Sequence, residues 1–97
     1  MSFAERAARG ATAFDRARPG WSGGISPGTV DVRSLDRCPA AHVFGSYDVA
    51  IRELRIANAI DAAELGLDVY PHENNPTDYL ALTEAWENEI HLRVNHR

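Results

Sequence analysis

Apolar residues near the N-terminus recur at steps of three and four, which places them on one face of a helix. The members of this face are Phe3, Ala7, Ala11 and Phe14. Ser2 and Glu5 have the spacing of a capping box, and Pro19 disfavours helical geometry in Arg18. The pattern therefore predicts a helix over residues 3–17. Three arginines fall largely off its apolar face: Arg6, Arg9 and Arg16.

A second helical pattern lies near the C-terminus. Asn75 can cap this helix, and Pro76 suits its first position, where a missing N–H costs nothing. Its apolar stripe comprises Tyr79, Leu82, Trp86 and Ile90. A different face carries Glu84, Glu87 and His91. Arg93 and Arg97 complement the negative end of the helix dipole.

The middle of the chain predicts a central helix over residues 39–57, interrupted by Gly45. Because a glycine inside a helix is unfavourable by roughly 1 kcal/mol relative to alanine, Gly45 is interpreted as a point of close approach by another helix. Residues 58–65 either extend this helix or form a short one of their own, and Gly66 marks its C-terminal stop.

Residues 20–37 are rich in glycine and predict a long ordered loop. Trp21 and Ile25 are expected to pin this loop to the core, and alternation around Val30 and Val32 allows one short extended piece. The predicted fold is mainly α: a compact bundle of three to four helices with a long ordered loop after the first. A length of 97 residues fits a single domain over 1–97.

Charge is unevenly distributed along the chain. Residues 1–37 hold six arginines and four acids (+2), whereas residues 38–97 hold four arginines and ten acids (−6), which gives the net charge of −4. A general nucleic-acid binder usually has the opposite sign, so nucleic acid is an unlikely partner, although a local basic face remains on the first helix. All ten basic residues are arginine, which is typical of a GC-rich genome such as that of an actinobacterium or its phages.

The sequence contains no apolar run long enough to cross a bilayer and no secretory signal. Its single cysteine excludes an intrachain disulfide. These features lead us to expect a cytoplasmic protein with no membrane association.

Catalytic and metal chemistry finds little support in the pattern. Cys38 and His42 share a helical face, but a structural zinc site normally takes four ligands in close pairs, and the spacing of His91 and His96 does not supply them. Ser46 lacks the second glycine of a nucleophile elbow. We therefore expect no catalytic residue, no metal, no cofactor and no enzyme activity.

Several positions are instead candidates for contact with a partner. They are Trp21, His42, Tyr70, Glu84, Glu87 and His91. Trp21 has two interpretations, because a tryptophan on a loop is either a core plug or an interface anchor.

An ordered series of short elements carries a resemblance. It comprises Arg18-Pro19-Gly20-Trp21, Val30-Asp31-Val32, Asp36-Arg37-Cys38, Phe44-Gly45-Ser46-Tyr47, Leu65-Gly66-Leu67-Asp68 and the stretch from Tyr79 to Ile90. Over roughly residues 5–93, this series resembles small uncharacterised proteins of actinobacteriophages, mycobacteriophages especially, and of actinobacterial prophages. Members often read Cys-Val-Leu-Gly-Gln before the Gly-Tyr element, whereas Cys38 is followed here by Pro-Ala-Ala-His and there is no second cysteine. The resemblance implies a phage origin and supplies no activity.

The leading hypothesis is a phage accessory protein that binds a host or phage protein, as in host takeover, with a homo-oligomer also open. One alternative is a nucleic-acid-binding or DNA-mimic protein, which would use either the +2 or the −6 segment. The other is a small metal-dependent or Cys/His hydrolase that would use Cys38, His42 or the acidic face.

Overall fold

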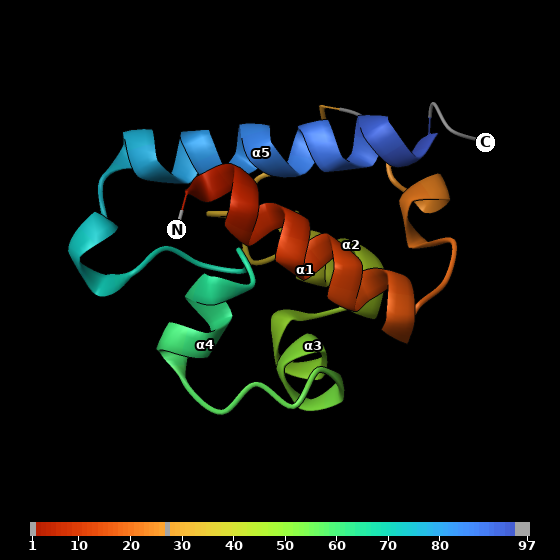
Figure 1. The fold of residues 1–97 in the computed structure, drawn as a ribbon, viewed down its shortest axis with the longest axis horizontal. Coiled ribbons are helices and arrows are strands. Elements are labelled where there is room, and N and C mark those ends of the chain that lie inside the picture. The colour runs from red at the N-terminus through yellow and green to blue at the C-terminus, as the bar shows by residue number, and fades with distance from the viewer. Residues whose placement is uncertain (1, 27, 95–97) are drawn as a thin grey trace.

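The computed structural model describes residues 2–26 and 28–94, which fold into helices joined by loops, with no strand among them (Figure 1). The α-helices are α1 (Phe3–Ala17), α2 (Pro39–Phe44), α3 (Tyr47–Glu53), α4 (Ala59–Glu64) and α5 (Pro76–Val94). Two short 3-10 turns are η1 (Trp21–Gly24) and η2 (Pro71–Glu73). The predicted mainly α bundle is confirmed, but the described residues form five α-helices where three to four were predicted. The long helices α1 and α5 pack against each other, and α3 and α4 lie on the side of α1 that faces away from α5 (Figure 1).

Helix α1 begins and ends where its apolar pattern predicts. The backbone N–H of Glu5 donates to Ser2 Oγ at 3.0 Å and that of Ser2 donates to Glu5 Oε1 at 3.3 Å, which completes the capping box. Ala7, Ala11 and Phe14 are fully buried. Arg6, which the pattern places off the apolar face, is nevertheless buried, with only 1% of the residue exposed.

Helix α5 also follows its pattern. Asn75 Oδ1 accepts from the backbone N–H of Asp78 at 3.0 Å, as expected of a cap. Three residues of its stripe, Leu82, Trp86 and Ile90, are 0% exposed, and Tyr79 is partly buried. Arg97 lies outside the described residues.

The prediction of one central helix over 39–57 is wrong. The chain breaks at Gly45, whose φ of +90° is a conformation that L side chains rarely adopt. Ser46 Oγ then accepts from the backbone N–H of Val49 at 3.2 Å and starts α3 afresh, and α3 ends at Glu53. A Cβ at Gly45 would meet nothing within 4 Å, so the expected close approach does not occur there.

Close approach occurs at two other glycines. A Cβ on Gly10 would lie 2.0 Å from the carbonyl oxygen of Leu65, and one on Gly66 would lie 3.0 Å from the backbone of Ala7. Gly66 ends α4 as predicted, with a φ of +68°. Its carbonyl oxygen accepts from the buried indole N–H of Trp86 at 2.6 Å. These contacts join α1, α4 and α5 at what we call the glycine junction: Gly10, Gly66 and Trp86.

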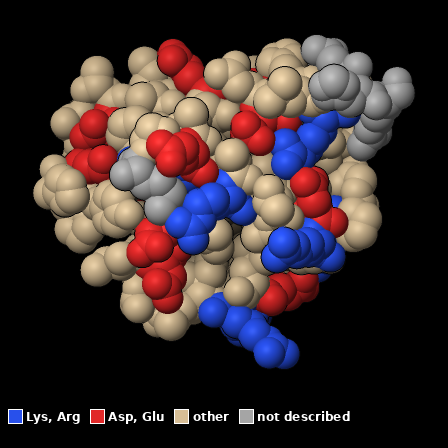
Figure 2. Space-filling view, in the orientation of Figure 1, with Lys and Arg blue, Asp and Glu red and all other residues tan. Residues whose placement is uncertain are grey.

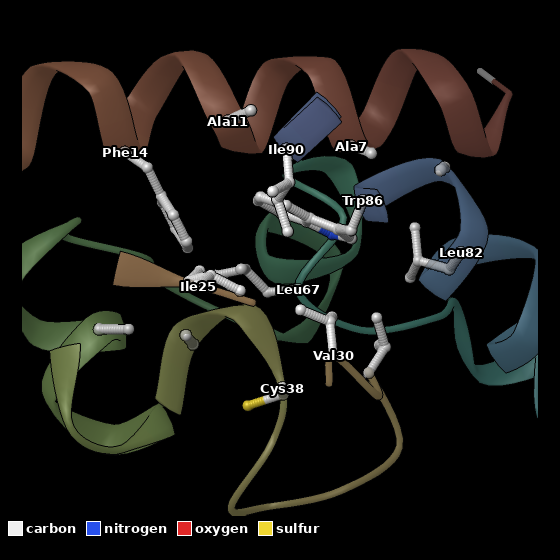
Figure 3. Close-up of a cluster of buried hydrophobic side chains, with 14 of the residues drawn as sticks. Ala7, Ala11, Phe14, Ile25, Val30, Cys38, Leu67, Leu82, Trp86 and Ile90 are labelled. Atoms are coloured by element: carbon white, nitrogen blue, oxygen red, sulfur yellow. The ribbon is translucent and has the colours of Figure 1, made fainter. Parts of the chain in front are cut away.

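Aromatic rings fill the centre of the core next to this junction (Figure 3). Around Phe14, ring centroids lie at 5.2 Å (Trp21), 5.1 Å (Phe44) and 5.0 Å (Trp86). Trp21 is 7% exposed and its indole N–H donates to Asp15 Oδ1 at 2.8 Å. It is therefore the core plug that holds the 20–37 loop. Val30 and Val32 are buried in turns and coil rather than in an extended strand.

Candidate functional site

The residues predicted to contact a partner do not form one site. Trp21 is buried in the core and offers almost no surface. His42 is partly buried, with Nε2 3.3 Å from the carbonyl oxygen of Thr29. On α5, Glu84 and His91 are exposed, whereas both carboxylate oxygens of Glu87 accept from the backbone N–H of Gly28, at 3.1 and 3.0 Å. Glu87 thus fixes the loop onto α5.

The Tyr70 ring packs against an ion pair between Arg6 and Glu73. The Arg6 guanidinium donates to both oxygens of Glu73, at 2.9 and 3.1 Å. It is held between the rings of Phe3 and Tyr70, at 4.4 and 4.7 Å from their centroids, and the His72 ring stacks on that of Tyr70 with centroids 5.6 Å apart. Burial acts to raise the pKa of Glu73, but the bonds from Arg6 and from the Tyr70 N–H outweigh it and hold that pKa below its usual value.

Cys38 is 3% exposed and caps α2, its Sγ accepting from the backbone N–H of Ala41 at 3.4 Å. Burial raises the pKa of its thiol, which disfavours the reactive thiolate. Its helical neighbour His42 bonds to Thr29 instead. Within the described part of the chain, no three histidine, cysteine or acidic side chains are grouped so that they could hold a metal ion; His96 lies outside it.

A cavity of about 220 Å³ opens beside Cys38. Four segments supply its walls: the 32–35 loop with Cys38, the start of α3, the stretch after α4, and the first turn of α5. The lining residues are Val32, Arg33, Ser34, Leu35, Cys38, Tyr47, Leu67, Asp68 and Tyr79. We call it the Asp68 cavity. Its polar groups come from positions too far apart in the sequence for any motif to reveal them.

Two phenols and a carboxylate face this cavity. The Tyr79 hydroxyl donates to Asp68 Oδ1 at 3.5 Å, and the same oxygen accepts from the backbone N–H of Val69 at 2.7 Å. Burial raises the pKa of Tyr47 and of Tyr79, and the Asp68 charge raises both further. Both phenols are therefore protonated at neutral pH: Tyr79 donates to Asp68, and Tyr47 has a hydrogen-bond donor available.

Arg33 stands at the rim. Its guanidinium carbon lies 5.7 Å from the centroid of the Tyr79 ring, and the side chain is exposed. Arg33 and Asp68 line the same cavity, yet the described residues include no ion pair between them. The cavity thus has a cation at its mouth and an anion on its wall that do not neutralise each other directly.

A second, more open hollow of about 380 Å³ adjoins the first and shares Arg33 and Tyr79 with it. Exposed leucines border the pair of hollows: Leu35 is 80% exposed beside the first, and Leu80 is 57% exposed beside the second. We call this the leucine-flanked surface: Leu35, Arg33, Tyr79 and Leu80.

Comparison with protein-family models, with curated proteins and with solved structures found no match to this chain. No helix in the described residues has the length and apolar character needed to span a bilayer.

Proposed function

We propose that this chain is a non-enzymatic phage accessory protein that acts by binding a host or phage protein in the cytoplasm of the infected cell. One observation carries the proposal: two leucines that the fold leaves in solvent line joined hollows, Leu35 in the first and Leu80 in the second. The phage origin rests on the resemblance of the ordered sequence elements.

Exposed leucines beside a concave surface favour a protein partner. Removing a leucine side chain from water lowers the free energy by about 25 cal/mol per Å² of apolar area buried. Apolar residues gathered around a hollow and bordered by polar groups are a common feature of protein interaction sites. Arg33 and Tyr79 belong to residue types enriched at such sites.

The chemical environment gives the alternative functions less support. The Cys38 thiol is buried and its pKa is raised, which is the reverse of an activated nucleophile. For nucleic acid, arginines would need to face phosphates freely. Several are instead held in ion pairs with acids: Arg6, Arg18, Arg37 and Arg93. Figure 2 shows arginine and acidic side chains interspersed on the face in view, without a field of one sign.

The test is affinity capture from an actinobacterial host lysate with matched surface variants. Leu35→Ser and Leu80→Ser remove the apolar groups of the leucine-flanked surface, while Leu92→Ser alters a leucine of similar exposure (52%) elsewhere on α5. The proposal expects a protein that wild type and Leu92→Ser both retain and that the other two variants lose. Equal capture by all four proteins, or by none, would contradict it.

A further inference from the structure

We propose that the Asp68 cavity binds a small zwitterion of the α-amino acid class, with its ammonium group on Asp68 and its carboxylate on Arg33. This goes beyond the binding of a protein partner, because it assigns a small-molecule ligand to a cavity that shares Arg33, Leu35 and Tyr79 with the leucine-flanked surface.

The first reason for proposing a zwitterion is that the cavity carries two opposite charges. The cavity presents a guanidinium and a carboxylate that make no ion pair with each other, and the Tyr79 ring lies between them: Arg33 over its face, Asp68 at its hydroxyl. A guest with one charge of each sign, held apart by a short carbon frame, satisfies both. Each contact would be a charge-assisted hydrogen bond, the stronger kind in proteins.

The second reason is that two polar atoms of the cavity lack hydrogen-bond partners within the described part of the chain. The Tyr47 hydroxyl forms no hydrogen bond to any described residue, and Asp68 Oδ2 likewise accepts none. A carboxylate guest can accept from Tyr47 as well as from Arg33, while an ammonium guest can donate to Asp68 Oδ2. Both groups would gain a partner on binding.

The volume of the cavity and its lining residues indicate the class of ligand. A volume of about 220 Å³ lies below the roughly 300–1,000 Å³ of pockets for drug-sized ligands and well above the roughly 30 Å³ that one water occupies. Val32 and Leu67 provide apolar walls beside the polar groups. The cavity therefore suits an amino acid with an aliphatic side chain rather than a nucleotide or a sugar.

Cys38 offers a direct readout, because it is the only cysteine in the chain and lines this cavity. The rate of its alkylation by iodoacetamide is measured with each standard amino acid except cysteine. Cys38 is 3% exposed, so its thiol reacts when the fold opens around it. A ligand that binds the closed cavity lowers the population of that open state, so at ten times its Kd the rate should fall by about tenfold. The fall should saturate with concentration. If no amino acid slows the reaction at millimolar concentration, the proposal is wrong.

Matched small molecules test the two-charge recognition without altering the protein. For leucine as an example, isopentylamine lacks the carboxylate and 4-methylpentanoate lacks the ammonium group. The proposal expects protection by the amino acid and much weaker protection by either fragment. Protection by one fragment equal to that by the whole amino acid would overturn it in favour of a site for a single charge.

Protein variants then test which side chain binds each charged group of the ligand. Asp68→Asn and Arg33→Gln should each abolish protection, whereas Arg52→Gln, an exposed arginine of α3 outside the cavity lining, should leave it intact. The alkylation rate without ligand is compared first, because an unchanged rate shows that Cys38 is still packed as in wild type. Persistent protection in Asp68→Asn would contradict the assignment. Loss of host-protein capture by the leucine variants would be a separate result, since Leu35→Ser and Leu80→Ser keep both charges.

Discussion

The glycine junction and the Asp68 cavity differ in how completely they are filled. At the junction, Gly10 leaves no room even for a methyl group, and the Trp86 indole is fully buried with its N–H bonded to a backbone carbonyl. The Asp68 cavity, in contrast, keeps about 220 Å³ open and is lined by two partly buried tyrosines and a carboxylate. One region is packed to contact, and the other is left open.

The contrast indicates a division of roles within a small core. A chain of 97 residues buries a modest share of its surface, so the tight packing of α1 against α4 and α5 has to supply much of the stability. The loop over residues 29–38 and the first turn of α5 can then hold polar groups around an opening. The following variants test this division.

The largest effect is expected at the junction. Gly10→Ala places a Cβ 2.0 Å from the Leu65 carbonyl oxygen and 2.7 Å from the Trp86 ring. The gain in helix propensity, roughly 1 kcal/mol, is outweighed by overpacking that a backbone atom cannot relieve. We expect a net loss of about 3 kcal/mol in the free energy of unfolding, measured by urea titration.

Gly24→Ala is the matched control, because a Cβ there meets nothing within 4 Å. Its effect should stay within about 0.5 kcal/mol. If Gly10→Ala is as stable as the control, the junction is not the tightly packed region of the fold.

A smaller loss is expected for Glu73→Gln, which removes the anion from the Arg6 pair. Arg6 is 1% exposed and would remain charged, but the Glu73 side chain is 21% exposed, so solvent moderates the loss. We expect a destabilisation of about 2 kcal/mol at pH 7, below the range for fully buried pairs. Asp36→Asn, an exposed acid, is the control.

The same pair predicts a pH dependence. The pKa of Glu73 is lowered in the folded state, so its contribution is present above the unfolded pKa near 4.5 and is lost as pH falls through the lower folded value. The stability difference between wild type and Glu73→Gln should therefore shrink from pH 7 towards pH 3. Urea titrations at several pH values measure it. A difference that is constant or grows in acid would contradict the ion pair.

Gly45→Ala should have a still smaller effect. The space around Gly45 is open, so the only penalty is the φ of +90° imposed on a residue with a Cβ. We expect a loss of about 1 kcal/mol by the same titration. A stabilised variant would mean that α2 and α3 form one continuous helix in solution.

These glycines show where prediction from sequence succeeds and fails. Periodicity and caps located α1 and α5, since an apolar stripe and a capping residue are local signals. A glycine in a helical pattern is ambiguous: Gly45 breaks a helix, whereas Gly10 permits contact between helices. The two are distinguished only by what packs against them, and sequence spacing does not contain that information.

The cavity was missed for a related reason. Arg33, Tyr47, Asp68 and Tyr79 come from four segments that only the tertiary fold brings together. Conversely, Trp21 and Tyr70 are of residue types that are common at protein interfaces. In the fold, however, Trp21 fills the core and Tyr70 covers Arg6. Side-chain type alone does not separate these roles.

The smallest effect on stability is expected at Leu35. This side chain is 80% exposed on the 29–38 loop, so Leu35→Ser removes little buried area, and the free energy of unfolding should change by less than about 0.5 kcal/mol. Leu67 also lines this cavity but is only 2% exposed, so Leu67→Ser should be strongly destabilising instead. Urea titration of both variants tests whether the leucine-flanked surface is independent of the core. If Leu35→Ser lowers stability as much as a core substitution does, then Leu35 packs within the folded chain and is not held free for a partner.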